Sequence, residues 1–94
     1  MMERPTRAQL LDTAKQIVTR DRADTHGNPE RNFGMVAAYW SAHLDHPVSA
    51  ADVAVLMTLF KLARLKANPG NLENWTDGCG YLACGGELAT EAQA

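Results

Sequence analysis

Apolar residues recur along most of this 94-residue chain at the three- and four-residue spacing of amphipathic helices, and no stretch shows the alternation of a strand. The pattern predicts helices over about residues 7–20, 29–44, 50–67 and 72–89, followed by a short polar tail at 90–94. We therefore predict an all-α fold, a compact bundle of about four helices that forms one domain over residues 1–94.

Capping and turn signals stand where each predicted helix begins. A capping box pairs a hydroxyl residue with a polar residue three places later, and proline favours the first helical position. The two boxes are Thr6 with Gln9 and Ser49 with Asp52, the second helix starts at Asn28-Pro29, and Asn68-Pro69-Gly70-Asn71 forms the last turn.

The third predicted helix is the most apolar, and its apolar pattern consists of Val53, Leu56, Met57, Phe60, Ala63 and Ala67. In the fourth helix, Gly78 and Gly85 lie seven residues apart and so nearly on one face, where a helix or ligand can approach the backbone closely. A small domain with this much apolar surface has a marginal core. We therefore expect a homo-oligomer.

Charge and composition narrow the possible partners. The formal net charge of -2 disfavours binding of extended nucleic acid, which needs a strongly basic face. Neither an apolar run long enough to span a membrane nor a signal-peptide pattern is present. Cys79 and Cys84, five residues apart in one predicted helix, do not share a face, so we expect no disulfide between them. We therefore expect a cytoplasmic location.

The densest group of polar residues lies at 22–33, between the first two predicted helices. Turn formation alone requires only Gly27-Asn28-Pro29, yet two arginines, a histidine and a further asparagine accompany it. Loops that carry such side chains often bind ligands. The candidate phosphate-binding residues of this segment are Arg22, His26, Arg31 and Asn32.

Lys61 and Arg64 place two cations side by side on the third predicted helix. One interpretation is that their stems cross apolar surface to reach water. The other is a phosphate clamp, because arginine binds two oxygens and lysine adds a point charge.

On the fourth predicted helix, Asn74, Asp77 and Tyr81 form a polar stripe on one face. An amide, a carboxylate and a phenol can together recognise a base edge or a ribose. Alternatively, Asp77 accepts a salt bridge from Lys61 or Arg64 inside the bundle. Trp40 and Trp75 are each either a core or interface anchor or a platform on which a purine stacks.

A metal site has weaker support. Glu73 and Asp77 are spaced to share a divalent cation, with Asp52 as a third ligand, but the first turn and the capping box explain Glu73 and Asp52 without metal. His26 has no second histidine at metal spacing, which disfavours zinc. We expect no cofactor, and Mg²⁺ only if the protein is an enzyme.

Taken in order, these residues resemble a family of small phage and prophage proteins. That family is similar in turn to phage nucleotide-modification-associated domains and, more distantly, to the all-alpha nucleotide pyrophosphohydrolases of the MazG and dimeric dUTPase type. The resemblance covers about residues 16–88, although the family usually has tyrosine in place of His26. It rests on Arg22-x-x-x-His26-Gly27, Asn32-Phe33, Lys61-x-x-Arg64-Leu65 and Trp75-x-Asp77-x-x-Gly80-Tyr81.

This resemblance implies a helical, oligomeric protein of the bacterial host cytoplasm, with a nucleotide-sized site formed by the first loop and the third and fourth helices. MazG-type enzymes hold magnesium with paired acids on two successive helices, E-x-x-E and E-x-x-D, whereas residues 32–44 here contain no carboxylate. We therefore expect binding of a nucleotide or nucleotide-derived signal without cleavage. A metal-dependent pyrophosphohydrolase is the alternative, and a structural or interaction module is the third.

Overall fold

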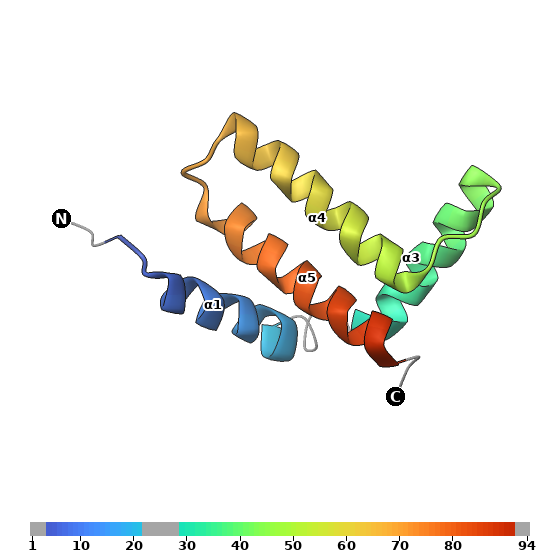
Figure 1. Ribbon diagram of the computed structural model, residues 1–94, viewed down its shortest axis with the longest axis horizontal. Coiled ribbons are helices and arrows are strands. Elements are labelled where there is room, and N and C mark those ends of the chain that lie inside the picture. Colours follow the sequence, from blue (N-terminus) through green and yellow to red (C-terminus); the bar gives the residue numbers. More distant parts are fainter. Residues whose placement is uncertain (1–3, 22–28, 92–94) are drawn as a thin grey trace.

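The computed structural model describes residues 4–21 and 29–91, and in those residues it confirms an all-α bundle of four helices without strands. Helix α5 lies between α1 and α4, and α3 crosses at a steep angle near the start of α4 (Figure 1). The elements are α1 (Arg7–Gln16), continued by the π-helix η1 (Ile17–Asp21), then α3 (Pro29–Leu44), α4 (Ala50–Ala67) and α5 (Leu72–Glu91).

Both predicted capping boxes are confirmed. The Gln9 backbone N–H donates to Thr6 Oγ1 at 3.1 Å, and the Thr6 N–H donates to Gln9 Oε1 at 2.8 Å. At α4, the Asp52 N–H donates to Ser49 Oγ and the Ser49 N–H to the Asp52 carboxylate, each at 3.0 Å. Each box satisfies backbone donors that the first helical turn would otherwise leave unpaired.

The first helix differs from its prediction, because the α-helical part ends at Gln16 and a π-helix follows. Val18 in this wider turn lies against Gly80 of α5, where an added Cβ would stand 2.9 Å from Val18 Cγ1. The spacing of apolar residues fits an α-helix and a single π turn equally, so the sequence does not distinguish them.

A small core forms where α3, α4 and α5 meet. The Phe33 and Tyr81 rings pack with centroids 6.2 Å apart and planes tilted by 42°, a favourable aromatic geometry. Partly buried apolar residues, including Trp40 and Met57, surround this centre. The buried cluster consists of Phe33, Ala37, Val53, Ala54 and Tyr81.

The apolar pattern of α4 is only partly buried. Ala54, Thr58 and Leu65 are buried with Val53, whereas Leu56 and Phe60 of the pattern are exposed. Apolar residues stand on almost every side of α4, so their spacing does not select one face.

The glycine prediction for α5 is confirmed at Gly85, whereas contacts within one chain do not test it at Gly78. An added Cβ at Gly85 would stand 2.8 Å from the Cβ of Ala54, so Gly85 permits close contact between α4 and α5 of one chain. An added Cβ at Gly78 would meet nothing within 4 Å. None of the helices in residues 4–21 and 29–91 combines the length and apolarity needed to cross a membrane.

Candidate functional site

An aromatic groove opens between α3 and the α4–α5 pair. Its volume of about 600 Å³ is typical of small-molecule sites. Helix α3 supplies one wall, and Met57 and Tyr81 come from the other two helices. Tyr39 is 68% exposed at the groove, so its ring face is available to a ligand. The lining residues among those described are Asn32, Phe33, Met35, Val36, Tyr39, Trp40, Val53, Met57 and Tyr81.

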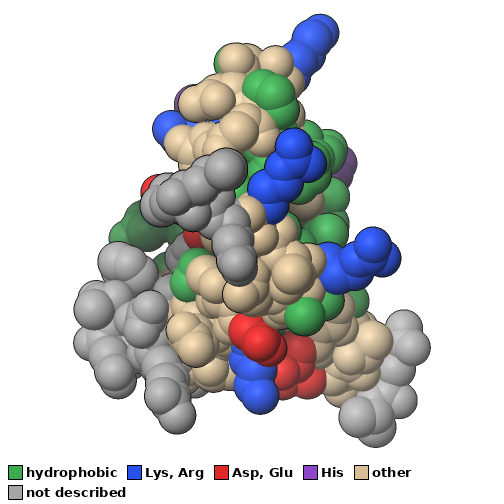
Figure 2. Space-filling view, turned by 90° about the vertical axis from the view of Figure 1, so that its left-hand side faces the viewer, with side chains coloured by type: hydrophobic (Ala, Val, Ile, Leu, Met, Phe, Trp, Pro, Cys, Tyr) green, Lys and Arg blue, Asp and Glu red, His purple; other side chains and the backbone are tan. Residues whose placement is uncertain are grey.

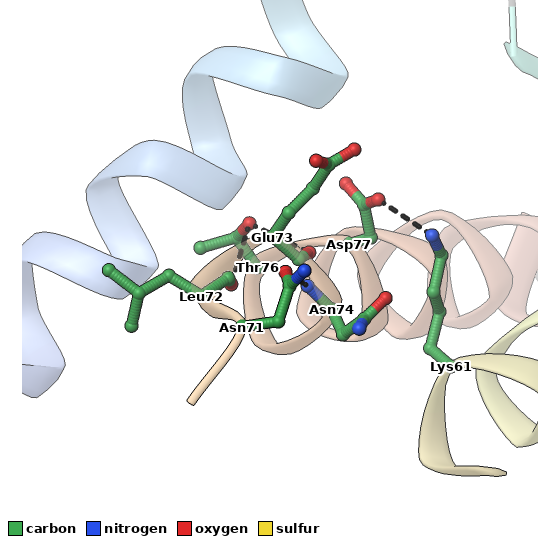
Figure 3. Close-up of polar contacts among 7 residues, drawn as sticks. All are labelled: Lys61, Asn71, Leu72, Glu73, Asn74, Thr76 and Asp77. Atoms are coloured by element: carbon green, nitrogen blue, oxygen red, sulfur yellow. Dashed lines mark hydrogen bonds and ion pairs between the residues drawn. The ribbon is translucent and has the colours of Figure 1, made fainter. Parts of the chain in front are cut away.

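A buried ion pair lies one helical turn beyond this groove. Lys61 follows Met57 by four residues on α4, and Asp77 precedes Tyr81 by four on α5, so both continue the lining faces. Lys61 Nζ stands 3.0 Å from the Asp77 carboxylate, and the two side chains are only 12% and 10% exposed. Figure 3 shows the lysine reaching from α4 to α5. The alternative in which Asp77 accepts a salt bridge inside the bundle is therefore confirmed, and Lys61 is its partner.

Arg64 is the exposed member of the cation pair. Its guanidinium carbon lies 5.5 Å from the centroid of the Phe60 ring, and Lys61 Nζ lies 6.0 Å from the same centroid. Arg64 follows Met57 by seven residues and so stands on the groove side of α4. Within residues 4–21 and 29–91, Arg64 makes no ion pair, so its charge is available to an anion.

Helix α5 holds the predicted polar stripe inside the bundle rather than at the surface. Asn74 is 5% exposed and its backbone N–H donates to the Asn71 side chain, while Thr76 Oγ1 donates to the Glu73 carbonyl. Of the stripe, Tyr81 alone lines the groove. Trp75 is half-exposed away from the groove, and its Nε1–H donates to the Pro69 carbonyl at 2.8 Å.

The carboxylates proposed for magnesium do not form one cluster. Glu73 and Asp77 project to the same side of α5 (Figure 3), but Asp52 caps the other end of the neighbouring helix. Hydrogen bonds from the Ser49 backbone and then the Ser49 side chain lower the pKa of the Asp52 carboxyl. No group of three acidic, histidine or cysteine side chains suited to a metal occurs among the described residues. Residues 32–44 contain no carboxylate, but helix α3 begins at Pro29 and therefore includes one acidic residue, Glu30, in its first turn.

The predicted site residues thus fall into three groups. The first group lies in the groove or on the helix faces that continue it, whereas Asn74 and Trp75 do not line it; this first group consists of Asn32, Lys61, Arg64, Asp77 and Tyr81. Arg22 and His26 lie outside the described residues, and Arg31 is described only through the α3 backbone.

Among the groove-lining residues of α3, Asn32 and Trp40 were candidates from the sequence, whereas Met35 and Tyr39 were not. Met35 and Tyr39 are four residues apart and both exposed, so they form a second apolar stripe beside the buried one. That stripe was the available signal, but only the crossing of α3 over α4 turns it into a groove wall.

Basic side chains are scattered on the end of the molecule seen in Figure 2, where Lys and Arg stand apart from one another among acidic and apolar groups. The described residues of that face form no continuous basic surface for an extended polyanion. The groove and its flanking cations instead match the dimensions of a small molecule that carries an aromatic ring and an anionic group.

Comparison with known proteins identifies relatives in phages. Residues 9–89 match the family model described as "Domain of unknown function (DUF6378)". The chain is 35% identical over 75 residues to the Gene 55 protein of Mycobacterium phage D29 and 33% identical over 73 residues to that of Mycobacterium phage L5.

These alignments cover 80% and 77% of this chain but 50% and 47% of the phage proteins, so the chain spans about half the length of the curated relatives it matches. No solved structure is significantly similar. Because the family model covers most of the chain and the core elements α3, α4 and α5, the chain belongs to the DUF6378 family.

Proposed function

We propose that this chain binds a nucleotide or a nucleotide-derived small molecule in the aromatic groove. The observation that carries the proposal is the combination of an exposed aromatic wall with the cations Lys61 and Arg64, which follow the groove residue Met57 by one and two turns of α4. A base can stack on Tyr39, since stacking on an aromatic side chain tolerates any base. The phosphate then lies toward Arg64, whose guanidinium can bind two oxygens.

Lys61 has a supporting role in this arrangement. Its charge is already balanced by Asp77, so it holds α4 against α5 more than it attracts an anion. Arg64 therefore supplies the main electrostatic attraction among the described cations. Arg22, His26 and Arg31 remain further candidates for the phosphate, as the resemblance to nucleotide-associated phage domains implies.

The phage origin of the relatives suggests two uses for such binding. The protein acts on the nucleotide pool during replication, or it sequesters a nucleotide signal made by a host defence system. Both uses require binding, and neither requires cleavage.

Calorimetry with a nucleoside and its matching 5′-phosphate tests the phosphate contact. We expect Arg64→Ala to weaken nucleotide binding ten- to hundredfold, since charge-assisted contacts contribute about 1.5–3 kcal/mol, and to leave nucleoside binding unchanged. Lys66→Ala is the matched control, because Lys66 is an exposed cation of the same helix. It follows Arg64 by two residues, about 200° around the helix axis, and so points away from the groove.

Equal losses for nucleoside and nucleotide in Arg64→Ala would show that this residue does not contact phosphate. A panel of nucleoside phosphates and cyclic dinucleotides in a thermal-shift assay identifies the ligand to use, because ligand at a hundred times its Kd stabilises by about 2.7 kcal/mol. No shift across the panel would contradict the proposal as a whole.

If the protein is instead a metal-dependent pyrophosphohydrolase, incubation of the purified protein with its nucleotide gives a different result. A binding protein retains its ligand chemically intact in EDTA and in Mg²⁺ or Mn²⁺. If either metal brings steady release of pyrophosphate, and Glu73→Gln abolishes the release while leaving the Lys61–Asp77 pair in place, the protein is a pyrophosphohydrolase.

A further inference from the structure

The solvent-facing side of α4 carries a row of large apolar residues. Val55, Leu59 and Leu62 are 50%, 53% and 54% exposed and follow one another at spacings of four and three. This spacing keeps them in line along one side of the helix, as in the seam of a coiled coil. A helix that is apolar on every side is normally buried on every side.

The neighbouring helix continues the same face. Leu82, Gly86 and Ala89 of α5 repeat the spacing of four and three, and Leu82 is exposed. A shallow hollow of about 300 Å³ between the helices is lined by these three residues and by Val55, which places both rows on one side of the α4–α5 pair. At Gly86 an added Cβ would meet nothing within 4 Å, so another helix can approach there.

The chain exposes more surface than a compact monomer of its mass, and the excess is larger than the area that a dimer interface removes from one partner. The chain exposes 7059 Å², roughly 1,700 Å² more than the about 5,300 Å² expected for a compact monomer of 10.2 kDa. Its radius of gyration of 14.4 Å likewise exceeds the value of about 12 Å typical of this length. A stable protein–protein interface removes about 800 Å² from each partner, so the excess is sufficient.

We propose that a second copy of this chain covers the outer face of α4 and α5, giving a two-fold symmetric dimer with an intermolecular bundle of four helices. A two-fold interface is self-complementary, and the charges at the ends of the α4 row satisfy that requirement. The row begins beside Asp52 and ends beside Lys66. When two α4 helices lie antiparallel, each acidic end faces the partner's basic end.

This face lies on the side of α4 away from Met57 and the aromatic groove, so dimerisation and ligand binding are separable. Gly85, where the sequence predicted a close approach, also lines the hollow but is itself buried. That glycine contacts Ala54 of its own chain.

Sedimentation equilibrium of the full chain at 1–100 µM tests the dimer. We expect twice the 10.2 kDa chain mass for the wild type and a monomer for Leu59→Glu, with dimer affinity reduced at least a hundredfold. Leu11→Glu is the control, since Leu11 on α1 is 59% exposed and receives the same change, and it should stay dimeric. Circular dichroism confirms that each variant is folded.

A wild type that remains monomeric at 100 µM overturns the proposal, as does a folded Leu59→Glu that dimerises normally. If Leu59→Glu does not fold, Lys66→Glu decides, because it places like charges at both ends of the interface and should weaken the dimer about tenfold. Lys15→Glu, in the last turn of α1, controls for the loss of a basic residue at a helix end. Equal dimer affinities in these two variants would overturn the proposed face.

Discussion

Asp77 is tolerated inside this bundle because Lys61 reaches it from the neighbouring helix. A carboxylate that is 10% exposed has lost most of its hydration, and the ammonium at 3.0 Å replaces part of that interaction. Such a pair contributes less to stability than its Coulomb attraction suggests, since both charges lose water. Its larger effect is to fix how α4 and α5 align beside the groove.

Removal of one partner should therefore cost more than removal of both. We expect Lys61→Met to destabilise the fold by about 3 kcal/mol, because it leaves the Asp77 carboxylate buried without a counter-charge. The double variant Lys61→Met/Asp77→Leu should recover most of that loss. Urea unfolding of the wild type, the two single variants and the double variant measures the coupling. A single variant as stable as the wild type would mean that water reaches the pair freely.

At the scale of the helices, α4 and α5 are held together at Gly85, where the two backbones come close. The missing side chain lets Ala54 pack directly on α5, and this contact lies next to the core residues Val53 and Tyr81. Gly78, in the same helix, has no such neighbour. The two glycines therefore have opposite consequences for stability.

We expect Gly85→Ala to cost about 1–3 kcal/mol, because its new Cβ would stand 2.8 Å from Ala54 and would push the helices apart. Gly78→Ala should stabilise by up to about 1 kcal/mol, since alanine is the better helix former and meets nothing within 4 Å. Thermal unfolding of the two variants compares the same chemical change in one helix. A stabilised Gly85→Ala would show that the helices can separate without loss.

Helix boundaries could be predicted because they depend on local chemistry. Pro29 at the first helical position and the Ser49–Asp52 box determine the start of α3 and α4 whatever the rest of the chain does. The buried face of α4 could not be predicted from periodicity, because Leu56 and Phe60 are as apolar as the residues that are buried. The packing of α4 against α3 and α5 determines which of its faces is buried.

Some residues of the candidate site could likewise be identified from the sequence, and others could not. The cations Lys61 and Arg64 were identifiable from their spacing, and one of the two alternatives for Asp77 was correct. The aromatic wall was identified only in part: Trp40 was a candidate for stacking, whereas Tyr39 becomes part of a groove only through the crossing of two helices. Residues that act through tertiary contact leave no periodic signal of their own.

The whole molecule is more extended than a typical domain of its length, with extents of 50 × 29 × 26 Å. Its most extensive helix contact joins α4 and α5, and α3 adds contact mainly with α4 (Figure 1). A structure of this shape buries little apolar surface within one chain, so much of its stability should come from association.

We therefore expect the thermal midpoint to rise with protein concentration. When unfolding and dissociation are coupled, each tenfold increase in concentration stabilises the dimer by about 1.4 kcal/mol, shared between two chains, which corresponds to roughly 3–6 °C for a domain of this size. Calorimetric scans of the wild type between 5 and 500 µM measure the shift, and Leu59→Glu should unfold at one temperature throughout. A wild-type midpoint that does not change with concentration would mean that each chain reaches its full stability alone, despite the apolar side of α4.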